Sequence, residues 1–186
     1  LKRQSSKSRF EDYGEFLDSL EMEAEIVPLE PVYYERACQL INKTNQFNLT
    51  TKRLTLSELE RYSVSDETLT LCGRLADKYG DNGLTSVIIA KTKGSVASID
   101  LWLMSCRVFK RELELAMFDV LIASCSARGV SEITGHYLPT AKNSIVANHY
   151  ERLGFSLVEE ESNGGSIWNY SIPECYENRN KHIKIL

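Results

Sequence analysis

The sequence predicts an α/β (α+β) protein in which helices flank a central mixed sheet that is mostly antiparallel. Three strand-like runs follow one another at 69–75, 84–90 and 96–104, and glycine-containing turns separate them. A long apolar helix is expected over 112–128, and a further strand over 130–138. Because a strand that returns after a helix usually runs parallel, we expect strands 96–104 and 130–138 to be parallel neighbours.

The remaining elements surround this core. Residues 9–22 have the apolar spacing of an amphipathic helix. We therefore divide the chain into a linker helix at 1–23, expected to come from a missing upstream domain, and a globular domain at 24–186. The other expected elements are a strand at 23–29, a helix from Pro31, a short helix opened by a capping box at 57–60, a helix capped by Asn143 that ends at Gly154, and a hairpin of 155–160 with 166–172.

Composition excludes several classes of protein. The 186 residues carry a net charge of −4, which does not favour binding to nucleic acid. No apolar run is long enough for a membrane span and the N-terminus is no signal peptide, so a cytoplasmic protein is expected. The five cysteines are widely spaced, which predicts reduced thiols without a metal site.

The order of these elements, together with residues 150–155 (YERLGF) after Asn143, resembles the GNAT acyltransferase fold. That resemblance implies that two central strands splay apart and that an acyl-pantetheine arm enters between them. In this chain they would be the strands 96–104 and 130–138. The pantetheine amides would pair with the exposed strand edge as an added strand does.

Most of the chain also resembles the C-terminal region of FkbH-like proteins (HAD-superfamily subfamily IIIC). The matching segments are 41–51 (INKTNQFNLTT), 80–84 (GDNGL), 99–108 (IDLWLMSCRV) and 137–143 (YLPTAKN). This resemblance implies an upstream HAD-like domain in the same polypeptide. It also implies an acyl carrier protein as partner, in the biosynthesis of methoxymalonyl units for polyketides. The implied cofactor is the phosphopantetheine of the carrier, or coenzyme A or acyl-CoA, without a metal.

Two departures from these families matter. The Asp-x-Asp motif of HAD domains is absent. The GNAT pyrophosphate loop keeps Arg107, but Lys110 and Glu112 stand where that family has glycines, and their side chains would hinder close approach of a pyrophosphate. A single carrier phosphate, or the acidic carrier surface, would instead meet Lys110 and Arg111.

Four residues are candidates for chemistry. Cys106 lies where a strand passes into a helix, so it is either a nucleophile that holds the acyl group or a small packing residue. Tyr150 matches the GNAT tyrosine that protonates the leaving thiolate, although it also fits an apolar core face. His136 and His149 are either bases or structural residues.

The binding residues form two predicted groups. Amides of the 41–51 tract, together with Lys43, either line a pocket for a hydroxylated acyl group or satisfy the end of a helix. Asp100, within an apolar run, is expected to face a polar pocket or an arginine. The predicted cofactor-binding residues are Leu103, Met104, Ser105, Arg107, Lys110, Arg111 and Asn143, and the predicted pocket residues are Asn42, Asn45, Gln46, Asn48, His136 and His149.

Three functions remain open from the sequence. The first is an acyltransferase that moves a glyceryl-type group to the pantetheine thiol of an acyl carrier protein. The second is a non-catalytic domain of the same shape that docks the carrier. The third is a CoA-dependent N-acetyltransferase, which the missing loop glycines disfavour.

Overall fold

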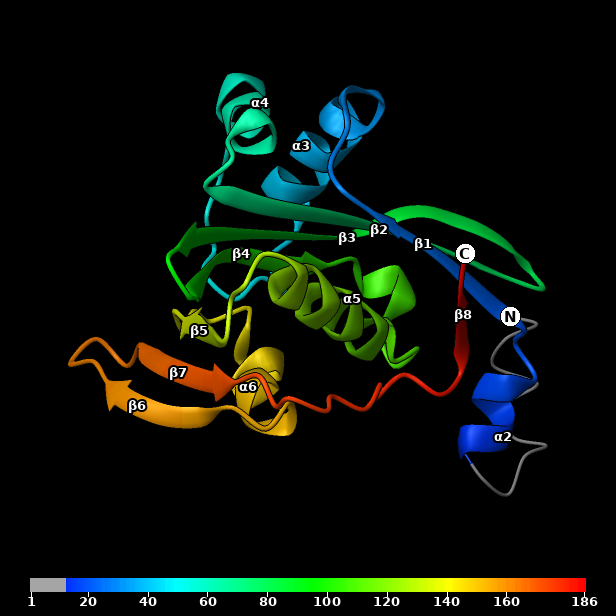
Figure 1. Ribbon diagram of the computed structural model, residues 1–186. Helices are drawn as coiled ribbons and strands as arrows, with labels where there is room; N and C mark the ends of the chain where they lie inside the picture. The colour runs from blue at the N-terminus through cyan, green and yellow to red at the C-terminus, as the bar shows by residue number, and fades with distance from the viewer. Residues whose placement is uncertain (1–12) are drawn as a thin grey trace.

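The computed structural model describes residues 13–186, which form one mixed sheet of eight strands with helices on both faces (Figure 1). The strand order is β6-β7-β5-β4-β3-β2-β1-β8, and only the pairs β4–β5 and β1–β8 are parallel. The predicted mostly antiparallel sheet is therefore confirmed. The strands are β1 (Met22–Val27), β2 (Thr68–Asp77), β3 (Gly80–Lys93), β4 (Val96–Met104), β5 (Glu132–Tyr137), β6 (Ser156–Glu160), β7 (Ser166–Ser171) and β8 (Ile183–Ile185).

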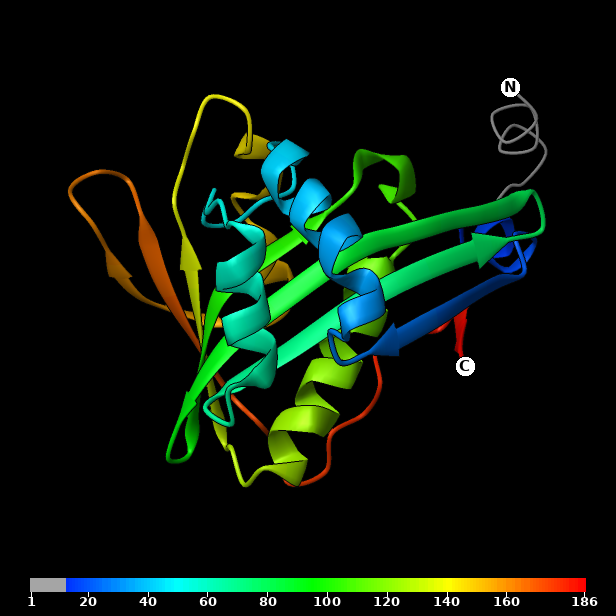
Figure 2. The same ribbon diagram turned by 90° about the horizontal axis from the view of Figure 1, so that it is seen from above.

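Each face of the sheet has its own helices (Figure 2). One face carries α3 (Tyr34–Lys43), which follows the 3₁₀ turn Pro31–Tyr33, and α4 (Leu56–Val64). The other carries α5 (Leu113–Ala127), which is apolar on all sides because the sheet and the C-terminal tail enclose it. Burial on both faces explains why central strands such as β4 are almost continuously apolar.

Two local predictions shift along the chain, the capping box by two residues and the turn expected at 80–83 by three. The capping box of α4 lies at Thr55, whose hydroxyl accepts from the Glu58 N–H at 3.3 Å while the Glu58 carboxylate accepts from the Thr55 N–H at 2.8 Å. The β2–β3 hairpin turns at Lys78 and Tyr79, because Asp77 pairs with Gly80. The glycine-rich 80–84 segment therefore belongs to β3.

The ends of the described chain add two small elements. The predicted helix at 9–22 is represented by α2 (Tyr13–Asp18), and its first four residues lie outside the described part. At the other end, β8 lies parallel to β1 and extends the sheet at the edge opposite β6. The preceding tail is held across α5 by the Asp119 carboxylate, which accepts the Tyr176 hydroxyl at 2.6 Å and the backbone N–H of Asn180 at 2.9 Å.

The strands β4 and β5 are parallel as predicted, but they pair over only four residues. Pairing runs from Val96 opposite Glu132 to Ile99 opposite Gly135. Beyond that point the two strands diverge, which leaves a space between 101–104 of β4 and 136–137 of β5. We call this space the β4–β5 slot.

None of the helices in residues 13–186 combines the length and apolarity that a membrane crossing requires. Over the same residues, no group of three or more His, Cys, Asp or Glu side chains is arranged to hold a metal ion.

Candidate functional site

Residues 47–49 occupy the β4–β5 slot as an inserted segment. The Leu49 N–H donates to the Trp102 carbonyl at 3.1 Å, and the Met104 N–H donates to the Phe47 carbonyl at 3.0 Å. On the other side, the Leu138 N–H donates to the Leu49 carbonyl at 2.8 Å. The inserted segment thus satisfies the edges of both diverging strands, as an added strand does.

Asn143 anchors the inserted segment. Its side-chain amide donates to the Asn48 carbonyl and to the Leu138 carbonyl, each at 2.9 Å, and its Oδ1 accepts the Thr140 N–H at 2.7 Å. Asn48 and Asn143 are both fully buried. The Asn143 amide therefore holds the backbone of the slot in place, a role that the predicted cofactor assignment did not include, and it does not form the predicted helix cap, because its hydrogen bonds go to the slot and to Thr140. The Asn48 amide instead donates to the Thr44 carbonyl and accepts the Thr51 N–H.

Behind the inserted segment lies a buried aromatic cluster with unsatisfied polar atoms. The His149 ring lies 5.0 Å from the Phe47 ring and 4.5 Å from the Trp102 ring, between centroids. Within residues 13–186, Trp102 Nε1, His149 Nε2 and the Tyr150 hydroxyl are buried without a hydrogen-bond partner of ordinary geometry, although the His136 backbone lies close enough to the Tyr150 hydroxyl to lower its pKa slightly. Such groups are rare in folded proteins, and they often mark a functional cavity.

Burial sets the protonation of this cluster. It lowers the pKa of His149 to about 3, so the imidazole is neutral at physiological pH. Burial also raises the pKa of Tyr150 far above its usual value, and the nearby backbone of His136 offsets a small part of that effect. The Tyr150 ring packs against Gly135, the last β5 residue that pairs with β4, and is 1% exposed. As folded, Tyr150 is a core residue that could protonate a leaving group only after the slot opens.

A hollow of about 690 Å³ opens at the C-terminal end of β4, on the side of α3. We call it the mouth pocket. Among the residues that the structure describes, four cationic side chains line it and no acidic one does, although the whole chain carries a net charge of −4. Its lining includes the exposed Cys106 and the predicted residues Asn45, Gln46, Met104, Ser105 and Arg107, with Arg36, Lys43 and Lys142 as the other cations.

The loop after β4 keeps an unusual backbone. Lys110 and Glu112 both have φ of 60°, a left-handed conformation that glycine adopts more readily. These are the two positions at which the GNAT pyrophosphate loop has glycines. The loop thus retains a glycine-like path while it carries two side chains.

Charged groups at the start of α5 are already engaged. The buried Arg111 guanidinium contacts Asp77 at 2.9 Å, so it is not available to a phosphate in this structure. Glu114 is buried in the first turn of α5, and burial raises its pKa while its own backbone N–H and Arg152 partly offset that shift. A carboxyl group at this helix end competes with any phosphate for the same N–H groups.

The predicted residues therefore separate into three places. Cys106, Arg107, Asn45 and Gln46 meet at the mouth pocket. His136 lies elsewhere, 3.2 Å from the Ser98 hydroxyl in a hollow of about 440 Å³ that Asp100 also lines. The others are structural or lie apart. Asn42 donates to the Cys38 carbonyl of α3 and to the Leu54 carbonyl before α4, and Lys110 is exposed on the loop. Leu103 is buried at the slot edge, and His149 and Tyr150 are in the core.

Sequence reasoning missed two cations of the mouth pocket. Arg36 lies seven residues before Lys43, a spacing that places both on the same face of α3, so the helical pattern contained this signal. Lys142 lies in the loop after β5, and no sequence pattern connects it with α3.

Comparison with solved structures places this fold among acetyltransferases. The ribosomal-protein-S18-alanine N-acetyltransferase from Escherichia coli matches with a TM-score of 0.60 and 16% identity, over 85% of this chain and 99% of that one. The PaiA N-acetyltransferase from Thermoplasma acidophilum, in complex with coenzyme A, gives 0.62 and 14%, over 80% and 99%. An acetyltransferase of the GNAT family from Streptococcus pneumoniae gives 0.58 and 16%, over 81% and 100%.

The chain therefore has the GNAT acyltransferase fold. At sequence level, no protein-family model matches it, and a search of curated proteins gives no significant match.

Proposed function

We propose that this domain is an acyltransferase that moves an acyl group to the thiol of the phosphopantetheine arm of an acyl carrier protein. The observation that carries the proposal is the mouth pocket, where four cations and no carboxylate surround an exposed thiol at the end of β4. A phosphate on a thiol-tipped arm, followed by the acidic surface of a carrier, has the charge that this pocket complements. The resemblance to FkbH-like proteins suggests a glyceryl-type acyl group.

The proposed chemistry is thioester exchange at Cys106. Its sulfur attacks the carbonyl carbon of a glyceryl thioester donor, the bond from that carbon to the donor sulfur breaks, and the proton of Cys106 passes to the departing donor thiol. The carrier's pantetheine thiol then attacks the same carbon, the bond from that carbon to the Cys106 sulfur breaks, and the pantetheine proton returns to Cys106; because both steps are reversible, a loaded carrier can also load Cys106. The departing thiol ends protonated, so no oxidant or reductant is required.

Entry of the arm requires that the inserted segment withdraw. An extended pantetheine would then pair with the Trp102 carbonyl and the Met104 N–H, which Leu49 and Phe47 now occupy. Opening would also bring the three unsatisfied polar atoms behind Phe47 into contact with the arm or with water, which would offset part of the lost pairing. The closed slot is thus the resting state of the proposed enzyme.

The experiment is intact-mass analysis after incubation with a glyceryl-loaded carrier protein. The proposal expects a covalent glyceryl adduct that is lost in Cys106→Ala and retained in Cys175→Ala, because Cys175 is also exposed but lies in the C-terminal tail. An adduct that survives Cys106→Ala would contradict the assigned nucleophile.

Two other functions have an observation in their favour. A carrier-docking domain without chemistry fits the buried Tyr150 and the closed slot, and it predicts carrier binding without an adduct. A CoA-dependent N-acetyltransferase fits the fold of the PaiA structure, which was solved with coenzyme A, and it predicts turnover of acetyl-CoA with an amine. The side chains of Lys110 and Glu112 and the buried Glu114 all stand against close binding of a pyrophosphate.

A further inference from the structure

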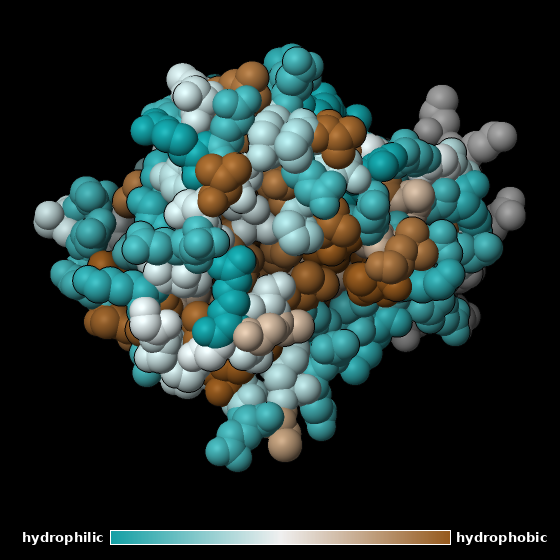
Figure 3. All heavy atoms as spheres, turned by 45° about the horizontal axis from the view of Figure 1, so that its top comes forward, coloured by the Kyte–Doolittle hydropathy of each residue, from teal (hydrophilic) through white to brown (hydrophobic). Residues whose placement is uncertain are grey.

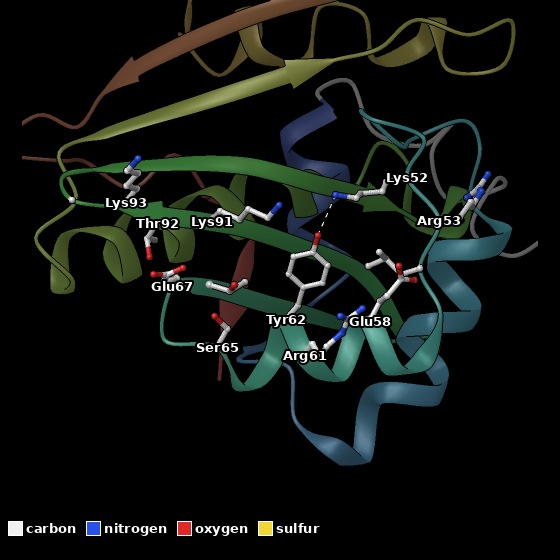
Figure 4. A pocket seen from close by; sticks show the side chains of 13 residues that line it. Lys52, Arg53, Glu58, Arg61, Tyr62, Ser65, Glu67, Lys91, Thr92 and Lys93 are labelled. Carbon is white, nitrogen blue, oxygen red and sulfur yellow. Dashed lines mark hydrogen bonds between the residues drawn. The ribbon is translucent and has the colours of Figure 1, made fainter.

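A third hollow, of about 960 Å³, lies between α4 and the end of the β3–β4 hairpin (Figure 4). The face with α3 and α4 is largely hydrophilic, with apolar patches between the polar groups (Figure 3). We call this hollow the lysine groove. Its lining contains five cationic side chains and two acidic ones: Lys52, Arg53, Arg61, Lys91 and Lys93, against Glu58 and Glu67.

Two ammonium groups of the groove converge on one carboxylate, that of Asp100, which lines the neighbouring hollow of about 440 Å³. Asp100 Oδ2 lies 2.6 Å from Lys52 Nζ and 3.5 Å from Lys91 Nζ, and it accepts the Tyr62 hydroxyl at 2.7 Å. Both ammonium nitrogens also lie 5.6 Å from the centre of the Tyr62 ring. Figure 4 shows Lys52 and Lys91 pointing toward one another beside the Tyr62 hydroxyl.

The charge at this point is not balanced. Burial alone would raise the pKa of Asp100, but hydrogen bonds from Lys52 and Tyr62 and the charges of the two lysines hold it below its usual value. One ionised carboxylate therefore faces two ammonium groups. The Glu58 carboxylate is engaged by the Thr55 N–H and hydroxyl, each at 2.8 Å, and these hydrogen bonds lower its pKa more than the charge of Lys52 does, so it offsets only part of the charge of the lysine pair.

The groove continues past the lysine pair. The hollow of about 440 Å³ that contains His136 shares Lys52 and Lys91 with the lysine groove, and Ser98, Asp100 and Glu161 also line it. An anion between the two lysines would therefore have an imidazole and a hydroxyl on its far side, and the Asp100 and Glu161 carboxylates there could accept from hydroxyl groups of the bound molecule. Hollows of this size fit small molecules, and a lysine pair suits a phosphate because ammonium groups act as point charges.

We propose that the lysine groove binds a small phosphate-bearing molecule, with the phosphate between Lys52 and Lys91 and a polar body directed toward Ser98 and His136. The surplus positive charge favours a dianion over a single carboxylate, and the groups beyond the lysines can donate to hydroxyl or carbonyl oxygens. The inference goes beyond the proposed function, because it requires neither Cys106 nor the opening of the slot.

The test is calorimetric titration of the full chain with inorganic phosphate and with glycerol phosphate, at constant ionic strength and with glycerol as the neutral control. Lys91→Gln is the informative variant, since it removes one ammonium and leaves the Lys52–Asp100 pair in place. Lys184→Gln is the matched control, because Lys184 is an exposed lysine that pairs with Glu23 on the far edge of the sheet.

We expect glycerol phosphate to bind more tightly than phosphate. Lys91→Gln should raise the dissociation constants of both ligands by about tenfold or more. Lys184→Gln should change the same two constants by less than about twofold. If both variants weakened ligand binding equally, the attraction would be non-specific and the proposed site would be wrong. Binding that is insensitive to Lys91→Gln but lost in Arg107→Gln would place the anion in the mouth pocket, and it would equally overturn the proposal.

Discussion

Gly135 shows how one missing side chain shapes the site. A Cβ at this position would lie 2.4 Å from ring atoms of Tyr150, and that ring is fully enclosed. Gly135→Ala is therefore expected to destabilise the fold by about 2 kcal/mol, measured by urea unfolding. Gly73→Ala is the control, because its Cβ meets the end of the flexible Met117 side chain at 2.6 Å. If Gly135→Ala lowered the free energy of unfolding no more than Gly73→Ala does, the Tyr150 ring would be shown to move aside, which contradicts the expectation.

The burial of a second single residue, His149, leads us to expect that the free energy of unfolding depends on pH. Its pKa in the folded protein is about 3, below the ordinary value of 6.5, so the unfolded chain binds the proton more readily. Stability is fully present above pH 6.5, and it is expected to fall by about 1.4 kcal/mol per pH unit as the pH decreases from there toward 3.

Urea unfolding at pH 7, 6 and 5 tests this expectation in the wild type and in His149→Leu. The variant lacks the titrating group, so its stability should change less between pH 7 and pH 5. Carboxylates such as Asp100 titrate at lower pH and contribute equally to both proteins. A wild type and variant that lose stability in parallel would contradict the assigned protonation of His149.

Among the elements, the inserted segment determines whether the β4–β5 slot is open. Asn143→Asp keeps the side-chain shape but removes both amide donors to the Asn48 and Leu138 carbonyls. Hydrogen exchange at the Leu49 and Leu138 amides is expected to accelerate by about tenfold or more, since two buried carbonyls lose their donor.

Asn42→Asp is the matched control for that experiment. The Asn42 amide also donates to two carbonyls, those of Cys38 and Leu54, but it is exposed and lies outside the slot. Exchange at Leu49 should be unchanged in this variant. If both variants accelerated exchange at Leu49 equally, Asn143 would not be the anchor of the inserted segment.

On the scale of the whole molecule, apolar runs and the glycine-containing turns between them were enough to predict the sheet. The strand at 96–104 and its parallel neighbour at 130–138 correspond to β4 and β5, because a buried strand, a long helix and a second strand leave few other arrangements. The tail strand β8 was not predicted, since three residues paired to β1 have too short a pattern to detect.

The site was less predictable because its key contacts are long-range. The amide-rich tract at 41–51 was expected to line a pocket or to end a helix, and in the structure Asn45 and Gln46 line the mouth pocket while Asn48 pairs with Leu103 of β4. That pairing joins residues far apart in the chain, and no local spacing encodes it. The left-handed backbone at Lys110 and Glu112 was likewise hidden, because side chains stand where glycine would have signalled it.

The central claim is that a pantetheine arm replaces the inserted segment in the β4–β5 slot. The most direct measurement is amide hydrogen exchange of the full chain with and without a glyceryl-loaded carrier protein. We predict faster exchange at the Leu49 and Leu138 amides, because both lose their hydrogen-bond acceptors when the segment withdraws. The Met104 amide should stay protected, because a carbonyl of the arm replaces that of Phe47 as its acceptor. Unchanged protection at all three amides when the carrier is bound would contradict it.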